Sequence, residues 1–183
     1  HVTGVQTCAL PISVALSGNG ELVAVASRDL GKAQAWIDEC QAHAPFATKP
    51  EAVAGYGALL ARDDIDAVYI PLPTGVRAEW VIKAARAGKH VFVEKPISNT
   101  LEDGRAMIAA AEAAGVVLAV GHSYRRHGAL RHLHRLIDEG ELGRVSLAEG
   151  VFSNDNGLAL EASVWRSDPA EIPGGCLMQI GIH

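Results

Sequence analysis

Cysteine is scarce in this chain of 183 residues, and Cys8, Cys40 and Cys176 lie too far apart to form a CxxC pair. The scarcity argues against a disulfide framework or a structural zinc site, and it favours a reducing, cytoplasmic environment. Long apolar runs are missing as well, because Glu112 interrupts the best candidate, residues 106–120, so we expect no membrane span. The formal charge of −5 argues against a surface that coats nucleic acid.

A glycine-rich phosphate loop is also missing. A dinucleotide-binding fold needs GxGxxG directly after its first strand, so that backbone N–H groups and a helix N-terminus hold the pyrophosphate. The chain offers only Gly18-Asn19-Gly20, which precedes an apolar run instead of following one. We interpret these residues as a turn, and a true phosphate loop would lie upstream of this sequence.

Both ends of the sequence suggest truncation. Residues 2–12 have no helical or strand period, and they resemble the translation of a common sequencing-library adapter, so we interpret residues 1–13 as a non-native segment. A secretory signal is the alternative, since residues 8–16 are mostly apolar, but no Lys or Arg precedes them. The chain stops at His183 inside what resembles a motif, so we expect a fragment.

Short apolar runs alternate with amphipathic helical patterns through the middle of the chain. Asp29 and Thr100 are predicted N-caps, and Gly115 is a predicted helix stop. Continuous apolar strands separated by helices predict a doubly wound parallel sheet, covered on both faces. The predicted strands are residues 22–26, 67–70, 90–93 and 116–120, and the predicted helices follow Asp29 and span residues 79–87 and 101–114.

The pattern changes after Gly121. A basic stretch, residues 125–135, leads into a predicted helix whose apolar side chains should face inward, namely Leu130, Leu133, Leu136 and Ile137. Residues 145–152 alternate more loosely and predict an antiparallel strand with one solvated face. We therefore expect a partial dinucleotide-binding domain over residues 14–121 and the beginning of a second, α/β domain over residues 122–183.

Polar residues follow three predicted strands, where a doubly wound sheet binds its ligands. Lys95 directly follows a buried strand, and partial burial lowers the pKa of a lysine toward the range useful for proton transfer. Pro96 fixes the backbone that carries it. Taken alone, the lysine fits better a surface residue paired with Glu94.

The end of the first predicted strand bears on cofactor choice. An acidic residue there usually binds the adenosine ribose, whereas an arginine meets a 2′-phosphate. Ser27 and Arg28 stand at this end, which favours NADP over NAD. The alternative is a solvated Arg28 followed by Asp29 as a simple helix cap.

Two further stretches carry candidate side chains. Residues 125–135 are basic, but their charges pair along one helix face, which argues against nucleic-acid or metal binding and leaves Arg125 as the functional candidate. Gln179 and His183 are four residues apart, so they share a face if this segment is helical. A histidine there exchanges protons near neutral pH, although a terminal, exposed histidine is the alternative.

Together these motifs resemble the Gfo/Idh/MocA family of NAD(P)-dependent oxidoreductases. The order and spacing of the motifs carry the resemblance, which covers nearly all of residues 22–183. The motifs are residues 23–26 with Ser27-Arg28-Asp29, residues 66–70 with Pro73-Thr74, residues 87–96 with Glu94-Lys95-Pro96, residues 121–125, and Trp165-Arg166 with Gly174-Gly175 up to His183.

The resemblance implies a Rossmann domain followed by a domain built on a mostly antiparallel sheet. It also implies hydride transfer between a nicotinamide and a small polyhydroxylated substrate, such as a sugar or polyol, with Lys95 and His183 as catalytic residues and Gln179 beside them on the substrate. We expect a homo-oligomer when the protein is complete, and an inactive fragment. The expected cofactor-binding residues are Ser27, Arg28, Pro71, Pro73, Thr74, Glu94, Lys95 and Arg125.

The chain departs from the family pattern at several positions. Gln179 stands where the family commonly has Asp, Arg77 where it often has His, and Gly128 where it often has Pro. A glutamine binds a hydroxyl but cannot ionise. Two other functions stay open, a non-catalytic sensor or co-repressor and a glycoside hydrolase that uses bound NAD, although Lys95 and His183 favour an enzyme over a sensor.

Overall fold

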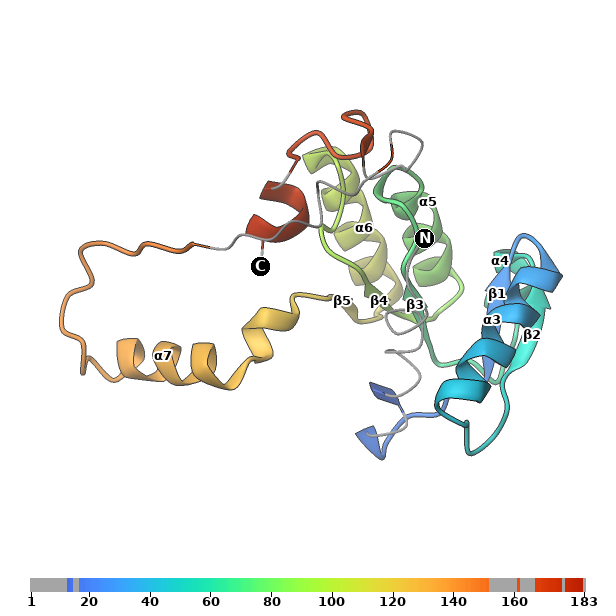
Figure 1. Ribbon diagram of the computed structural model, residues 1–183. Helices are drawn as coiled ribbons and strands as arrows, with labels where there is room; N and C mark the ends of the chain where they lie inside the picture. The colour runs from blue at the N-terminus through green and yellow to red at the C-terminus, as the bar shows by residue number, and fades with distance from the viewer. Residues whose placement is uncertain (1–12, 15–16, 152–160, 162–166, 176, 183) are drawn as a thin grey trace. The chain divides into compact units, whose positions relative to one another are not determined.

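The computed structural model describes residues 13–14, 17–151, 161, 167–175 and 177–182, in two compact units, His1–Asp66 and Ala67–His183 (Figure 1). The non-native segment predicted at residues 1–13 lies almost wholly outside the described residues. Gly18 adopts a positive φ of 68° in a bend before the first strand, which confirms the predicted turn.

From residue 24 on, the first unit contains a two-stranded parallel sheet with two helices. Its elements are β1 (Ala24–Ser27), α3 (Leu30–His43), β2 (Glu51–Ala54) and α4 (Tyr56–Leu60). Ala24 pairs with Glu51 at one end of the ladder and Ser27 with Ala54 at the other. The predicted cap of α3 is confirmed, because Asp29 Oδ1 accepts the Gly31 N–H at 2.8 Å.

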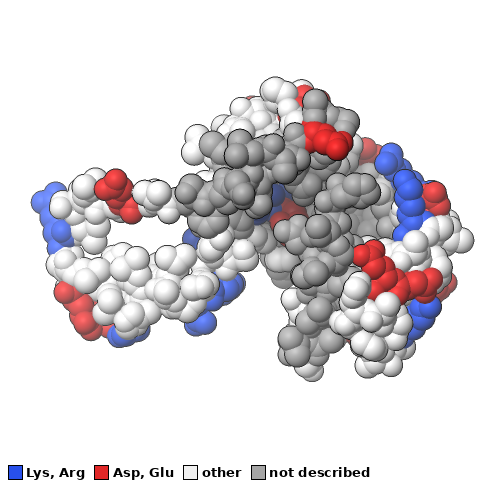
Figure 2. Space-filling view, in the orientation of Figure 1, with Lys and Arg blue, Asp and Glu red and all other residues white. Residues whose placement is uncertain are grey.

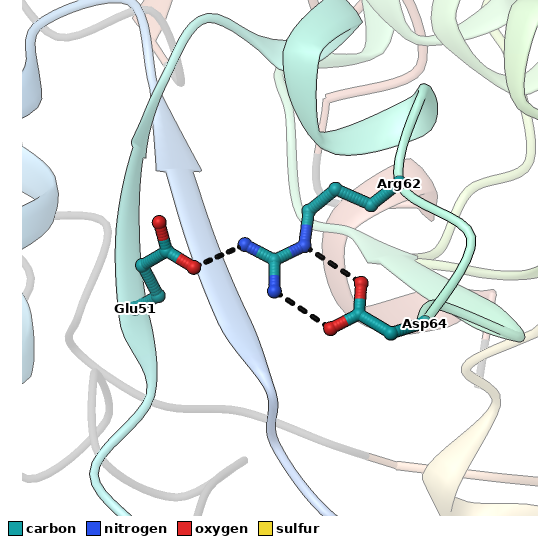
Figure 3. A network of polar contacts seen from close by, with 3 residues as sticks. All are labelled: Glu51, Arg62 and Asp64. Carbon is teal, nitrogen blue, oxygen red and sulfur yellow. Dashed lines mark hydrogen bonds and ion pairs between the residues drawn. The ribbon is translucent and has the colours of Figure 1, made fainter.

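A strand at Glu51–Ala54 was not expected from the sequence. Only one of its four residues, Val53, is β-branched, so the local strand preference is weak and pairing with β1 decides the structure. Arg62 donates a hydrogen bond to Oε2 of Glu51, the first residue of β2 (Figure 3). It also donates two hydrogen bonds of 2.8 and 2.7 Å to the Asp64 carboxylate. These exposed ion pairs order the connection after α4 but stabilise the fold little.

The second unit contains a three-stranded parallel sheet in the order β3-β4-β5. Three elements have the predicted bounds: the strands Ala67–Ile70 and His90–Val93 and the helix Leu101–Ala114. Helix α5 (Thr74–Arg86) begins five residues before the predicted helix. Pro73 explains the difference, since a proline is well suited to the start of a helix. The elements are β3 (Ala67–Ile70), α5 (Thr74–Arg86), β4 (His90–Val93), α6 (Leu101–Ala114), β5 (Leu118–Val120), η1 (Ser123–Arg126), α7 (Gly128–Asp138) and η4 (Leu177–Gly181).

The caps of α6 match the sequence prediction. Thr100 Oγ1 accepts the Asp103 N–H at 3.1 Å, and Gly115 ends the helix in the left-handed conformation at φ 66°. Helix α6 packs beside α5 (Figure 1). Their buried side chains, together with alternate strand residues, form the core: Val68, Ile70, Val81, Ala84, Ala85, Val91, Val93, Met107 and Ala111.

Within the second unit, helices α5 and α6 lie on the same face of the sheet β3-β4-β5. Phe92, between the buried Val91 and Val93, is 41% exposed, and it stacks on Tyr69 with ring centroids 5.6 Å apart. The reason that the two helices share a face is topological. The strands follow one another in order, so two right-handed crossovers place α5 and α6 on the same face.

Two predictions after Gly121 are wrong, the strand at residues 145–152 and the buried apolar face of the helix before it. Residues 145–151 form no strand, since a strand needs a neighbour to pair its backbone groups and no described strand lies beside them. Helix α7 exists, but its apolar face is not buried, with Leu130, Leu133 and Ile137 each more than 40% exposed. Within the described residues, no helix combines the length and the apolar character needed to cross a bilayer.

Candidate functional site

Two loops meet at the carboxyl edge of β3 and β4. Residues 71–73 follow β3, and Glu94-Lys95-Pro96 follows β4. The two strands are parallel neighbours with Ile70 opposite Val93, so the loops leave the sheet side by side. Lys95 is half-buried and precedes a cis peptide bond to the buried Pro96. The predicted lysine therefore stands at the edge of the sheet where ligands bind in such folds.

Arg77 joins these two loops. Its side chain is only 2% exposed and comes from the first turns of α5. Nε and Nη2 donate to the Leu72 carbonyl at 3.1 and 2.7 Å. Nη1 donates to the Glu94 carbonyl at 2.8 Å and to the Pro96 carbonyl. The planar guanidinium thus binds one carbonyl before Lys95, one after it and one in the neighbouring loop. We call this set of bonds the Arg77 clamp.

The Glu94 carboxylate binds two further groups. The Tyr69 hydroxyl donates to Oε1 at 2.7 Å, and the Lys95 N–H donates to Oε2 at 3.3 Å. Burial, followed by these contacts with Glu94, raises the pKa of Tyr69 well above its ordinary value, so the phenol stays protonated and can donate. Burial lowers the pKa of Arg77, while the nearby Glu94 charge opposes that shift. The guanidinium remains charged.

A glycine begins the third loop, after β5. The Gly121 N–H donates to the Val93 carbonyl at 2.8 Å. A Cβ at Gly121 would lie 3.3 Å from Phe92 Cζ and 3.5 Å from Glu94 Oε1, so the loop comes directly against the Glu94 side chain. Arg125 follows in η1 and is exposed.

The first residue of α5 provides a buried hydroxyl. Thr74 is 3% exposed, and its Oγ1 has no hydrogen-bond partner among the described residues. Next to it, the Gly75 N–H donates to Glu171 Oε2 at 3.3 Å, as expected for a carboxylate at a helix N-terminus. The helix otherwise has no side-chain cap. An unsatisfied buried hydroxyl is uncommon and suits a ligand group.

The remaining predicted residues lie in other parts of the chain. Ser27 is the last residue of β1 in the first unit, and its Oγ accepts the Asp29 N–H at 3.3 Å. Arg28 follows β1 and is exposed. Asp29 caps α3, as predicted. Gln179 lies in η4, and His183 lies outside the described residues.

The basic stretch forms pairs along its own helix. Arg135 bonds to Glu139, and His134 lies 2.7 Å from Asp138. Figure 2 shows acidic and basic side chains close together in this region. In the part of the chain that the structure describes, no three His, Cys, Asp or Glu residues gather as a metal would require.

Sequence reasoning missed the clamp, the Tyr69–Glu94 bond and Glu171. One signal was present: Arg77 lies four residues before Val81, so both lie on the buried face of α5. A charged side chain on a buried face needs polar partners. The contact between Glu171 and α5 joins residues 96 positions apart, and no local pattern indicates it.

Parallel strands in βαβ order, with polar loops at their carboxyl ends, define a Rossmann-type nucleotide-binding fold. Residues 7–122 match the family profile described as "Oxidoreductase family, NAD-binding Rossmann fold", and residues 130–183 match the "GFO/IDH/MocA C-terminal domain". The chain belongs to the GFO/IDH/MocA family, and the resemblance drawn from its motifs is confirmed.

Named relatives and a solved structure agree with this assignment. A dTDP-3,4-didehydro-2,6-dideoxy-alpha-D-glucose 3-reductase from Saccharopolyspora spinosa is 36% identical over 163 residues, 89% of this chain and 46% of the relative. The D-xylose 1-dehydrogenase (NADP(+)) 2 of Haloferax volcanii is 39% identical over 89% of this chain and 47% of its own length. The chain therefore spans about half the length of these relatives.

The solved structure belongs to a protein from Desulfitobacterium hafniense assigned as an NADPH-dependent oxidoreductase. It is 38% identical, with a TM-score of 0.83, and the match covers 97% of this chain and 49% of that one. The α/β fold with parallel strands, predicted from the sequence, is confirmed at this identity.

Proposed function

We propose that the protein containing this chain is an NADP-preferring oxidoreductase, which transfers a hydride between the nicotinamide and a hydroxyl or carbonyl carbon of a sugar or related polyol. The observation that carries the proposal is the half-buried Lys95 at the carboxyl edge of a sheet whose neighbouring strand leads into the buried Thr74. The printed activities of the relatives, a keto-sugar reductase and a xylose dehydrogenase, support the substrate class.

The residues at the strand ends fit a dinucleotide. Thr74 Oγ1 is a buried hydroxyl with no partner among the described residues, and the exposed Arg28 follows β1 at the position where arginine meets a 2′-phosphate. The names of the Haloferax and Desulfitobacterium proteins favour NADP. Pro71, Pro73, Glu94 and Arg125 complete the proposed cofactor contacts.

Lys95 manages the proton of the reacting alcohol. A bound nicotinamide supplies the carbon that accepts or returns the hydride. An alcohol carbon releases hydride readily only as its O–H proton leaves, so the Lys95 amine takes that proton in oxidation and its ammonium returns it in reduction. Because the clamp holds the Lys95 backbone, less conformational freedom has to be lost when the amine reaches the substrate oxygen.

The segment after residue 121 would complete the site. We place Gln179 on a substrate hydroxyl and His183 on the reacting oxygen, and we place the domain boundary between residues 121 and 122. The separate family matches over residues 7–122 and 130–183 support that boundary. We further propose a cytoplasmic homo-oligomer.

The test uses the complete protein that contains this sequence, NADPH, and a panel of keto sugars and aldoses. Oxidation of NADPH is followed by its absorbance, and NADPH binding by fluorescence. We expect Lys95→Met to lower kcat roughly 100-fold or more, the range lost with a general acid–base group, while NADPH affinity stays within about threefold, since the lysine's task is chemistry.

Lys83→Met is the matched control, because Lys83 is exposed on α5 and pairs with Glu79; it should leave kcat unchanged. Turnover by Lys95→Met at the normal rate would contradict the role of Lys95. A wild-type protein that binds NADPH but converts no sugar would favour the non-catalytic sensor.

A further inference from the structure

We propose that Arg77 is a positioning residue for Lys95. The inference rests on the proposed function, because it concerns where the catalytic amine stands. Arg77 is buried and donates all its described hydrogen bonds to backbone carbonyls, at Leu72, Glu94 and Pro96. Two of these carbonyls flank Lys95 in the sequence, so the guanidinium holds the backbone on both sides of the lysine without contacting a ligand itself.

The peptide group between Glu94 and Lys95 is bound at both of its polar atoms. Its oxygen accepts from Arg77 Nη1 at 2.8 Å, and its N–H donates to Glu94 Oε2 at 3.3 Å. Because a peptide group is planar, fixing both atoms fixes the orientation of the plane. Because Arg77 also holds the Pro96 carbonyl, the backbone is held on both sides of Lys95, which restricts the direction in which its side chain leaves.

A second brace holds the Glu94 carboxylate in place. The Tyr69 hydroxyl, from within β3, donates to Oε1 at 2.7 Å. The lysine loop is thus fastened to β3 through Tyr69 and to α5 through Arg77. Both elements contribute buried core residues to the second unit, Val68 from β3 and Val81 from α5. The loop is therefore attached to two well-packed elements.

Arginine is suited to this task in a way that its obvious replacements are not. A guanidinium has five N–H donors in one plane, whereas a neutral imidazole has one and an ammonium has three on a single point charge. Four donor–acceptor contacts to three carbonyls from two loops need that spread. A lysine at position 77 keeps the charge but reaches fewer of the carbonyls.

The experiment compares Arg77→Lys and Arg77→Gln in the complete protein, with Arg86→Lys and Arg86→Gln as matched controls on the exposed last turn of α5. Thermal unfolding shows that each variant is folded. The kinetic readout separates kcat from KM. The second readout does not need activity: lysines are ¹³C-methylated, the Lys95 NMR signal is identified by its loss in Lys95→Arg, and its shift and titration midpoint are recorded.

We expect folded Arg77→Lys to lose about 10- to 100-fold in kcat, as for a misplacement of roughly 1 Å, while KM for NADPH changes less than about threefold. Its Lys95 signal should shift or broaden, and in Arg77→Gln the titration midpoint should move to higher pH because a nearby positive charge is lost. The Arg86 variants should leave both readouts unchanged.

The proposal is overturned if folded Arg77→Lys leaves the Lys95 signal and kcat unchanged, or if its activity falls only in proportion to the folded fraction. The proposed function fails separately, when Lys95→Met turns over normally. In that case the NMR signal of Lys95 still decides whether Arg77 positions the lysine, because that measurement depends on the protein alone.

Discussion

Replacing Arg77 by Met should destabilise the protein far more than replacing Arg62 by Met, although Arg62 has the charged partners. The Arg77 side chain is 2% exposed, and Arg77→Met leaves the three carbonyls of Leu72, Glu94 and Pro96 without their donor. At about 1 kcal/mol for each carbonyl left without its donor, the loss is about 3 kcal/mol. Arg62 pairs with exposed carboxylates, and such surface pairs contribute little.

The assay is urea unfolding of the complete protein, in which the midpoints of wild type, Arg77→Met and Arg62→Met are compared at equal slope. Arg77→Met should shift the midpoint clearly to lower urea, and Arg62→Met only slightly. Equal shifts for the two variants, or a loss below about 1 kcal/mol for Arg77→Met, would refute the reasoning that satisfied carbonyls outweigh exposed charge pairs.

Three other substitutions test the site. Thr74→Val should leave the unfolding midpoint unchanged, because the hydroxyl has no partner among the described residues, yet weaken NADPH binding in a fluorescence titration; unchanged binding would remove Thr74 from the cofactor site. Tyr69→Phe should flatten the stability profile at high pH. The pKa of Tyr69 is raised in the folded state, so the unfolded chain loses its proton first above about pH 10 and wild-type stability falls there; an identical decline in both proteins would contradict this. Arg28→Ala should lower the preference for NADP over NAD in kcat/KM, and an unaltered ratio would speak against a 2′-phosphate contact.

The parts of the fold that the sequence predicted are those with strong local signals. The strand His90–Val93 is apolar and branched, and Leu101–Ala114 has a threonine cap and a glycine stop. The strand Glu51–Ala54 lacks such signals, because its conformation depends on pairing with β1. The side of the sheet on which α5 and α6 pack is set by the hand of the crossovers, which a run of apolar letters does not reveal.

The candidate site was predictable only in part, for a related reason. Lys95 could be found because a charged residue directly after an apolar strand marks the sheet edge. The role of Arg77 could not be found, because its partners are backbone carbonyls, which every residue has. Tyr69 and Glu94 are 25 positions apart, so only the parallel pairing of β3 with β4 brings them together.

The choice of main-chain oxygens as acceptors for Arg77 affects how this region tolerates mutation. A substitution at Leu72 changes a side chain but leaves the bound carbonyl in place. The spacing of the two loops can therefore persist while side chains such as that of Leu72 change. The bonds of the clamp, which join the two loops to α5, all depend on one side chain, that of Arg77.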